Sequence, residues 1–248
     1  MTDIEFEVTA RRGADLGGSL VLATANPGLA GLSVVDYLVS QTDAEQVGHV
    51  RARGLADVTP FTDGEPRHAV RLYSPPERNV TVLTGELFLP TAAGEPFVEA
   101  IVEWATGVGI WEFVAPYAVP YPHGPEEHRV FYVGTSAFRE RRVSGHDVAP
   151  LKGGYLDGPT GELLTAGLDR DAPVGALITP SHPPGPDLDA AVRILEALDD
   201  LYDLDVDPTE LRARADERRR HYAELAQRVQ TLDDRTGGGE YPEDRMFM

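Results

Sequence analysis

The stretch "SLVLATANPGLAGLSVVDYLVSQ", Ser19 to Gln41, decides the fold. Its first seven residues form an almost continuous apolar run, which is typical of a strand buried between helices in a parallel sheet. The turn "NPG" follows, and apolar residues then return at helical spacing, at Leu29, Leu32, Val35 and Leu38. The stretch therefore predicts a buried strand, a tight turn and a helix.

The same alternation continues outward along the chain. Apolar or alternating runs predict further strands at residues 4–8, 47–52, 68–73, 79–85, 110–114, 129–136 and 174–180. Helical periodicity covers residues 95–106, 162–168 and 187–202, with Asp187 as a suitable N-cap for the last of these. Four prolines, at 116, 120, 122 and 125, predict an irregular segment between two of the strands. Strands alternating with helices indicate an α/β domain over residues 1–206, with a mainly parallel sheet covered by helices on both faces.

A helix of different character follows over residues 207–234. Its seam positions are spaced four and three residues apart, at Leu211, Ala215, Arg218, Tyr222, Leu225, Val229 and Leu232. This is the heptad period of a helix that packs lengthwise on a partner helix. The partner is either the protein's own domain or another subunit, and the pattern leaves both open. Residues 235–248 then form a flexible tail: three glycines, Gly237 to Gly239, an acidic stretch, and Met246-Phe247-Met248.

Composition excludes several classes of function. The formal net charge is −19, and the only Lys, Lys152, accompanies 21 Arg. Nucleic acid is not expected as a partner, because binding phosphates requires a basic surface. Such an acidic chain stays dispersed at high salt, where the Debye length falls to about 3 Å at 1 M. The composition therefore predicts a salt-loving, haloarchaeal source.

The chain has no Cys, which excludes a disulfide framework, a thiolate metal site and a thiol nucleophile. The amino terminus lacks the pattern of a signal peptide, and no stretch reaches the roughly 18 apolar residues that a membrane span needs. We expect a soluble, cytoplasmic protein that does not bind membranes.

Little in the sequence indicates catalysis. Seven His residues, at 49, 68, 123, 128, 146, 182 and 221, are scattered without a chelating spacing such as HExxH. No catalytic residue, metal site or cofactor is therefore predicted. Two glycine-rich loops are candidate ligand or interface loops: Asn26, Pro27 and Gly28 in the first, and Gly153, Gly154, Gly158 and Gly161 in the second. The second loop would offer helix N–H groups to an anion, but it also fits a tight turn that packs a helix on the sheet.

Four segments in this order resemble the proteasome assembly chaperone family, the archaeal and bacterial relatives of the second eukaryotic proteasome assembly chaperone. They are "ANPGLAGLSVVDYLVSQ", "NVTVLTGE" with "FVEAIVEWATGVG", "GPTGELLTAGL" with "VGALITPS", and "PDLDAAVRILEALDDLYDLDVD". The resemblance runs from about Leu20 to about Glu217 and is strongest after Pro186-Asp187. It implies a Rossmann-like or phosphorylase-like topology, a small homo-oligomer, and a non-enzymatic role around proteasome α subunits or the α ring.

The resemblance also implies a carboxy-terminal hydrophobic-Tyr-any motif that enters pockets between α subunits. Met246, Phe247 and Met248 match this motif as partner-binding residues, with Phe247 in place of Tyr. The missing hydroxyl removes a hydrogen bond that is typically worth about 0.5–1.5 kcal/mol. Two alternatives remain: a ligand-binding domain or enzyme of nucleoside-phosphorylase-like fold that uses the glycine-rich loops, and a structural assembly whose tail docks on its own neighbour.

Overall fold

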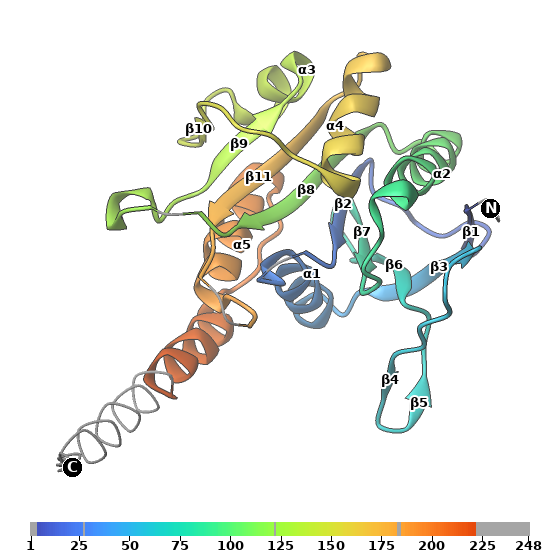
Figure 1. Ribbon diagram of the computed structural model, residues 1–248, viewed down its shortest axis with the longest axis horizontal. Coiled ribbons are helices and arrows are strands. Elements are labelled where there is room, and N and C mark those ends of the chain that lie inside the picture. Colours follow the sequence, from blue (N-terminus) through green and yellow to red (C-terminus); the bar gives the residue numbers. More distant parts are fainter. Residues whose placement is uncertain (1–3, 27, 122, 183–184, 222–248) are drawn as a thin grey trace, which may run out of the picture.

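A nine-stranded sheet runs through the centre of the protein in the order β1-β3-β6-β7-β2-β8-β11-β9-β10 (Figure 1). The computed structural model describes residues 4–26, 28–121, 123–182 and 185–221. The strands are β1 (Glu5–Ala10), β2 (Ser19–Thr24), β3 (Glu45–Arg53), β6 (Val70–Ser74), β7 (Val80–Gly85), β8 (Glu112–Val119), β9 (Phe131–Gly134), β10 (Ala149–Pro150) and β11 (Val174–Pro180). A separate hairpin of β4 (Phe61–Thr62) and β5 (Glu65–Pro66) projects from one end of the sheet (Figure 1).

The four central strands, β7, β2, β8 and β11, run parallel to one another. Every residue of β2, β7 and β11 is buried, which confirms the buried strands predicted from their continuous apolar runs. On one side β6, β3 and β1 continue the sheet in antiparallel pairs, and on the other β9 lies antiparallel to β11. The burial of β1 alternates along the strand, as expected at an edge with one wet face.

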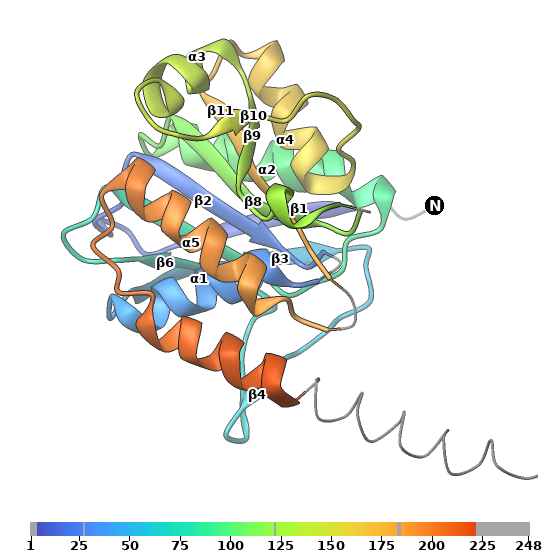
Figure 2. The same cartoon turned by 90° about the vertical axis from the view of Figure 1, so that its left-hand side faces the viewer.

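Helices cover both faces of the sheet, so the predicted three-layer α/β architecture is confirmed (Figure 2). Helices α1 (Ala30–Gln41) and α5 (Leu188–Tyr202) pack on the face that holds Val21 and Ala23. Helices α2 (Gly94–Gly107) and α4 (Gly158–Asp169) pack on the opposite face, which holds Leu20 and Leu22. Successive residues of β2 therefore point into different cores, because side chains alternate across a strand. The short helical elements are η1 (Thr91–Ala93), η2 (Pro125–Glu127), α3 (Ser136–Phe138) and η3 (Arg139–Val143).

Strand β8 extends beyond the run predicted for it and passes through Pro116. A proline lacks the N–H that a central strand normally uses, so the sequence predicted an irregular segment there. The pairing of β8 with β2 ends at Val114, and the Pro116 carbonyl lies so close to α1 that a Cβ on Gly31 would be 2.4 Å from its oxygen. The glycine in α1 and the proline in β8 thus permit a close approach of helix and strand at the end of the ladder.

A further helix covers residues 209–221 and is joined to α5 by the non-helical residues 203–208. It lies beside α1 and α5 on the outer side of the helical layer that these two helices form (Figure 2). The rest of the helix predicted to residue 234, and the tail at 235–248, lie outside the described residues. Within the described residues, none of the helices is long and apolar enough to span a membrane.

Candidate functional site

The carboxyl ends of the parallel strands form one edge of the sheet, which is the usual location of sites in open α/β folds. The loop after β2 carries Asn26 and Gly28, and the loop after β11 carries Ser181 and His182. The two loops are joined by a hydrogen bond from the backbone N–H of Asp187 to the Gly28 carbonyl, at 2.9 Å. The first candidate loop therefore lies against the start of α5.

Glycine is required at position 28 for two reasons. Its φ is +83°, a left-handed conformation that side chains rarely adopt, and an added Cβ would lie 3.1 Å from Ser181 Oγ. Asn26 beside it is buried, and its Oδ1 accepts no hydrogen bond from the described residues. Pro27, the third residue predicted in this loop, lies outside the described residues.

The second glycine-rich loop packs against a different helix. A Cβ on Gly161 would be 2.3 Å from the Leu156 carbonyl oxygen, and Gly94 at the start of α2 lies against Glu162 and Gly158. Gly158 has a φ of +58° and precedes Pro159 in the first turn of α4. An added Cβ would meet nothing within 4 Å at Gly153, Gly154 or Gly158. The close contact at Gly161 and the positive φ at Gly158 are features that a tight turn at the start of α4 requires, and whether the loop also binds a ligand stays a prediction.

Three of the seven histidines come together at the same carboxyl edge, although their positions in the sequence gave no chelating spacing. His123 follows β8, His128 precedes β9, and His182 follows β11. One ring nitrogen from each lies within 4.8 Å of the others. The signal that could have indicated them is topological, because all three adjoin strand ends that meet at one edge of the sheet.

The surroundings of this histidine cluster (His123, His128 and His182) are polar and partly enclosed. A cavity of about 530 Å³ adjoins His128 and His182, and its other walls are Pro186, Asp187, Leu188, Asp189, Arg193, Ala215, Arg218 and Arg219. Burial, together with Arg193 and the other two histidines, lowers the pKa of His128, and Asp187 opposes this shift.

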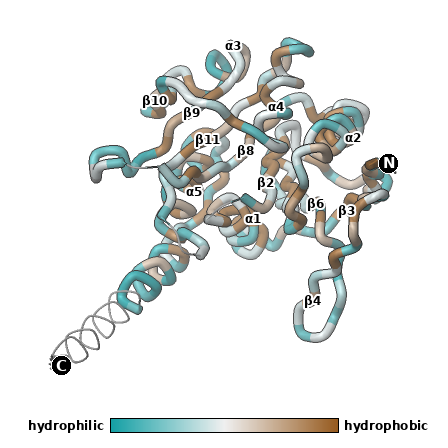
Figure 3. Tube along the Cα trace, in the orientation of Figure 1, coloured by the Kyte–Doolittle hydropathy of each residue, from teal (hydrophilic) through white to brown (hydrophobic). Residues whose placement is uncertain are grey.

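The first part of the carboxy-terminal helix is anchored to the body. Leu211 and Ala215, the first two positions of the predicted seam, are 2% and 3% exposed, so this part of the seam packs within the chain. Ahead of the helix, Tyr37 of α1 donates to the Asp207 carbonyl at 2.6 Å. Figure 3 colours most of the described part of this helix as hydrophilic. Met246, Phe247 and Met248, the predicted docking residues, lie outside the described residues.

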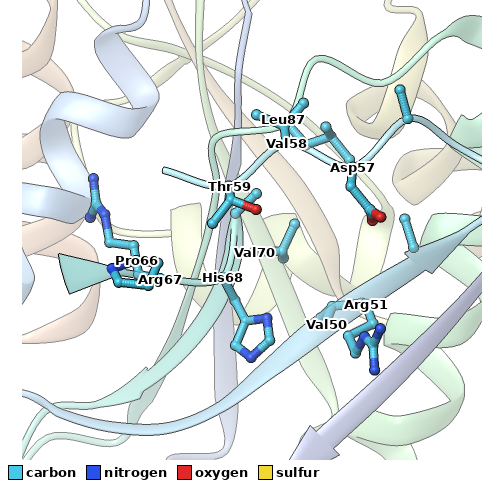
Figure 4. A pocket seen from close by; sticks show the side chains of 13 residues that line it. Val50, Arg51, Asp57, Val58, Thr59, Pro66, Arg67, His68, Val70 and Leu87 are labelled. Carbon is cyan, nitrogen blue, oxygen red and sulfur yellow. The ribbon is translucent and has the colours of Figure 1, made fainter. Parts of the chain in front are cut away.

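A second cavity, of about 480 Å³, lies where the β4–β5 hairpin meets the sheet. Figure 4 shows Val58, His68 and Val70 among the side chains around it. The rings of His68 and His49 stack at 3.7 Å. Phe61 on the hairpin and Val58 are exposed apolar residues.

Comparison with known proteins places this arrangement in a family. Residues 20–226 match the model of the PAC2 family. The chain belongs to the PAC2 family. The match covers nearly the same range as the predicted resemblance, from about Leu20 to about Glu217, and confirms it. No curated protein matches this PAC2 family member significantly by sequence.

Solved structures share the fold over almost the whole PAC2 chain. PbaA of Pyrococcus furiosus, an archaeal homologue of proteasome-assembly chaperone, is 17% identical with a TM-score of 0.80, over 94% of this chain and 96% of its own. PbaB of the same organism, an archaeal proteasome activator, is 21% identical with a TM-score of 0.75, over 91% of this chain and 99% of its own. The Mycobacterium tuberculosis proteasome-assembly chaperone homologue Rv2125 is 20% identical with a TM-score of 0.63, over 83% of this chain and 94% of its own. At these identities the likeness shows a common fold.

Proposed function

We propose that this PAC2 family protein is a non-enzymatic proteasome assembly chaperone or proteasome-binding adaptor. It forms a homo-oligomer and docks its carboxy-terminal tails on the α subunits of the proteasome. The observation that carries this proposal is the family match over residues 20–226, combined with structural neighbours that include a proteasome-assembly chaperone homologue and a proteasome activator.

The anchored helix supports a role for the tail. Leu211 and Ala215 are buried in the body, so the start of the helix has a fixed direction. Twenty-seven residues of sequence follow His221 and end in Met246-Phe247-Met248. Burying a Phe or Met side chain contributes roughly 1.5–3 kcal/mol, and association costs several kcal/mol or more. A single tail therefore binds weakly, whereas several tails on one oligomer gain from effective concentration.

The proposal is tested by measuring binding to purified proteasome α rings at high salt. Deletion of residues 246–248 and Phe247→Ala are both expected to remove most of the binding. Phe247→Tyr is the matched control, because it keeps the aromatic ring and adds the hydroxyl of the family motif; we expect it to bind as well as the unaltered chain or better. Undiminished binding of the deletion variant would refute the role of the tail.

One observation favours a second candidate, a small-molecule-binding domain at the carboxyl edge of the sheet. Asn26 Oδ1 is buried and is not hydrogen-bonded by any described residue, and a buried acceptor of this kind costs about 1–3 kcal/mol. A polar ligand could supply the missing donor. A thermal-shift screen with nucleotides, phosphate and sugars tests this candidate: a saturable shift that Asn26→Ala abolishes would support it.

A further inference from the structure

The strongest unassigned feature of the protein is the histidine cluster at the carboxyl edge of the sheet. His123 Nε2 and His128 Nε2 are 2.9 Å apart. The ring centroids of the three histidines are 4.8, 4.8 and 5.1 Å apart, and the ring planes are inclined by 64°, 55° and 89°. Inclined rings with converging nitrogens differ from the parallel stack of His49 and His68, whose planes are inclined by only 3°.

These distances fit a single metal ion. Two imidazole nitrogens bound to the same ion at about 2.0–2.1 Å lie roughly 3.3 Å apart at a tetrahedral angle and about 2.9 Å apart at a right angle. The pair formed by His123 and His128 already has such a separation. The third nitrogen lies within 4.8 Å of both, and His182 is exposed, so its side chain has room to rotate toward the pair.

Hydrogen bonds at Nδ1 orient two of the three rings so that Nε2 can bind a metal ion. The Nδ1 atom of His123 lies 2.6 Å from the Tyr121 carbonyl oxygen, and the Nδ1 atom of His182 lies 3.1 Å from Asp187 Oδ2. Each Nδ1 therefore carries the proton that it donates to oxygen, and the lone pair lies on Nε2. The Nε2 of His123 accepts a hydrogen bond from His128 Nε2 at 2.9 Å, which a bound metal ion would replace. Histidines that bind metals nearly always donate their second ring N–H to a carbonyl or a carboxylate in this way.

The space beside the cluster is compatible with a bound ion. Its walls carry the carboxylates Asp187 and Asp189 and the arginines Arg193, Arg218 and Arg219. Asp189 pairs with Arg219 at 3.0 Å, and Arg193 hydrogen-bonds to Thr179 Oγ1 and to the Pro180 carbonyl, so Asp187 is the carboxylate that contacts the histidines. The cavity next to His128 and His182 leaves room for water or another ligand at a remaining coordination position.

We propose that His123, His128 and His182 bind one divalent transition-metal ion of the zinc class. Imidazole ligands favour Zn²⁺, Cu²⁺, Ni²⁺ and Fe²⁺ over Mg²⁺ and Ca²⁺, which prefer oxygen ligands. Because His123 and His128 lie in the connection between β8 and β9 and His182 lies after β11, the ion joins these two connections. This site is independent of the proposed docking of the tail, and one can fail without the other.

The test is a titration of the full-length protein, purified without a polyhistidine tag, with Zn²⁺ by calorimetry and with Co²⁺ by visible absorption. We expect one ion per chain, with the visible bands of Co²⁺ bound at low coordination number, and no detectable binding of Mg²⁺. His128→Ala and His182→Gln should each weaken Zn²⁺ binding by tenfold or more, because both side chains are exposed and their loss leaves the core unchanged.

The control is the double variant His49→Ala/His68→Ala, which removes two histidines that lie elsewhere, at β3 and just before β6. It is expected to bind Zn²⁺ as the unaltered protein does. The proposal is overturned if the unaltered protein binds no Zn²⁺, if His128→Ala and His182→Gln leave its affinity unchanged, or if the control loses as much affinity as they do. The titration of the unaltered chain decides the matter even if a variant fails to fold.

Discussion

The Asp187 carboxylate joins His182 to the start of α5. Its Oδ2 accepts a hydrogen bond from the His182 backbone N–H at 2.7 Å, and its Oδ1 caps the helix by accepting from the Ala190 N–H at 2.8 Å. One buried side chain thus fixes both the loop after β11 and the helix that follows. The sequence predicted the cap, and the structure adds the bond to the loop.

Asp187→Ala is expected to lower the free energy of unfolding by about 0.5–2 kcal/mol from loss of the cap alone. Asp187→Ser should recover much of this loss, because a serine hydroxyl can cap the helix. Asp189→Asn is the control, because Asp189 lies two residues further along in the first turn of α5 and does not cap the helix. This variant should change stability little. Urea unfolding measures all three, and equal stability of Asp187→Ala and the unaltered protein would contradict the cap.

Arg142 is expected to be essential for stability because Glu112 is fully buried in the central strand β8. The Arg142 Nε donates to Glu112 Oε1 at 2.6 Å, and Ser19 Oγ lies 3.3 Å from the same oxygen. Removing Arg142 leaves the buried Glu112 carboxylate with one exposed cation, Arg141, whose Nε lies 3.7 Å from Glu112 Oε2. Breaking a buried ion pair costs about 3–5 kcal/mol, and Arg141 offsets part of that cost. Arg142→Ala should therefore lower the unfolding midpoint strongly.

The control for this prediction is Arg139→Ala on the same short helix. Its pair with Glu140 is exposed on both sides, and exposed pairs contribute about 0–1 kcal/mol. If the two alanine variants unfold at the same urea concentration, the buried pair does not have the role assigned to it.

Gly161→Ala tests whether the second glycine-rich loop serves packing. The new Cβ would lie 2.3 Å from the Leu156 carbonyl oxygen, so helix or loop must shift, and overpacking of this kind costs about 1–3 kcal/mol. Gly153→Ala is the matched control, since its Cβ would meet nothing within 4 Å. A thermal melt should show a lower midpoint for Gly161→Ala only; equal midpoints would argue against the packing role.

Leu211→Ala should release the carboxy-terminal helix from the body. Leu211 is 2% exposed, and a buried Leu→Ala change costs about 2–5 kcal/mol where the protein does not relax. We expect faster amide hydrogen exchange over residues 209–221 and little change in the central strands. Arg214→Ala, which removes only the exposed pair of Arg214 with Glu210, should leave exchange unchanged. Unaltered exchange in Leu211→Ala would show that this contact does not hold the helix.

Much of the fold was predictable because hydrophobic periodicity reports burial directly. The continuous runs of β2, β7 and β11 indicated strands buried on both faces, and the spacing in α1 and α5 indicated helices with one apolar side. Strand β8 was harder to predict, because it stays paired with β11 through Pro116 to Val119 while its pairing with β2 ends at Val114. A proline is tolerated in a strand where no partner needs its missing N–H, and one sequence does not show where that is. The antiparallel edge strands form local pairs whose direction the pattern leaves open.

The histidine cluster could not be predicted from spacing, because its members come from two connections that only the sheet brings together. His123 and His128 are five residues apart, and His182 is 54 residues further along the chain. Their assembly depends on β9 lying antiparallel to β11, which brings the start of β9 to the carboxyl edge. The acidic composition and the family resemblance, by contrast, could be read from the sequence alone.

The central claim is that this protein acts on the proteasome through its tail. Co-purification from native cells at their working salt concentration tests it most directly, because an acidic protein's contacts depend on screening. We predict that the full-length chain recovers proteasome α subunits and that the chain lacking residues 246–248 recovers few or none. Failure of the full-length chain to recover α subunits would contradict the account.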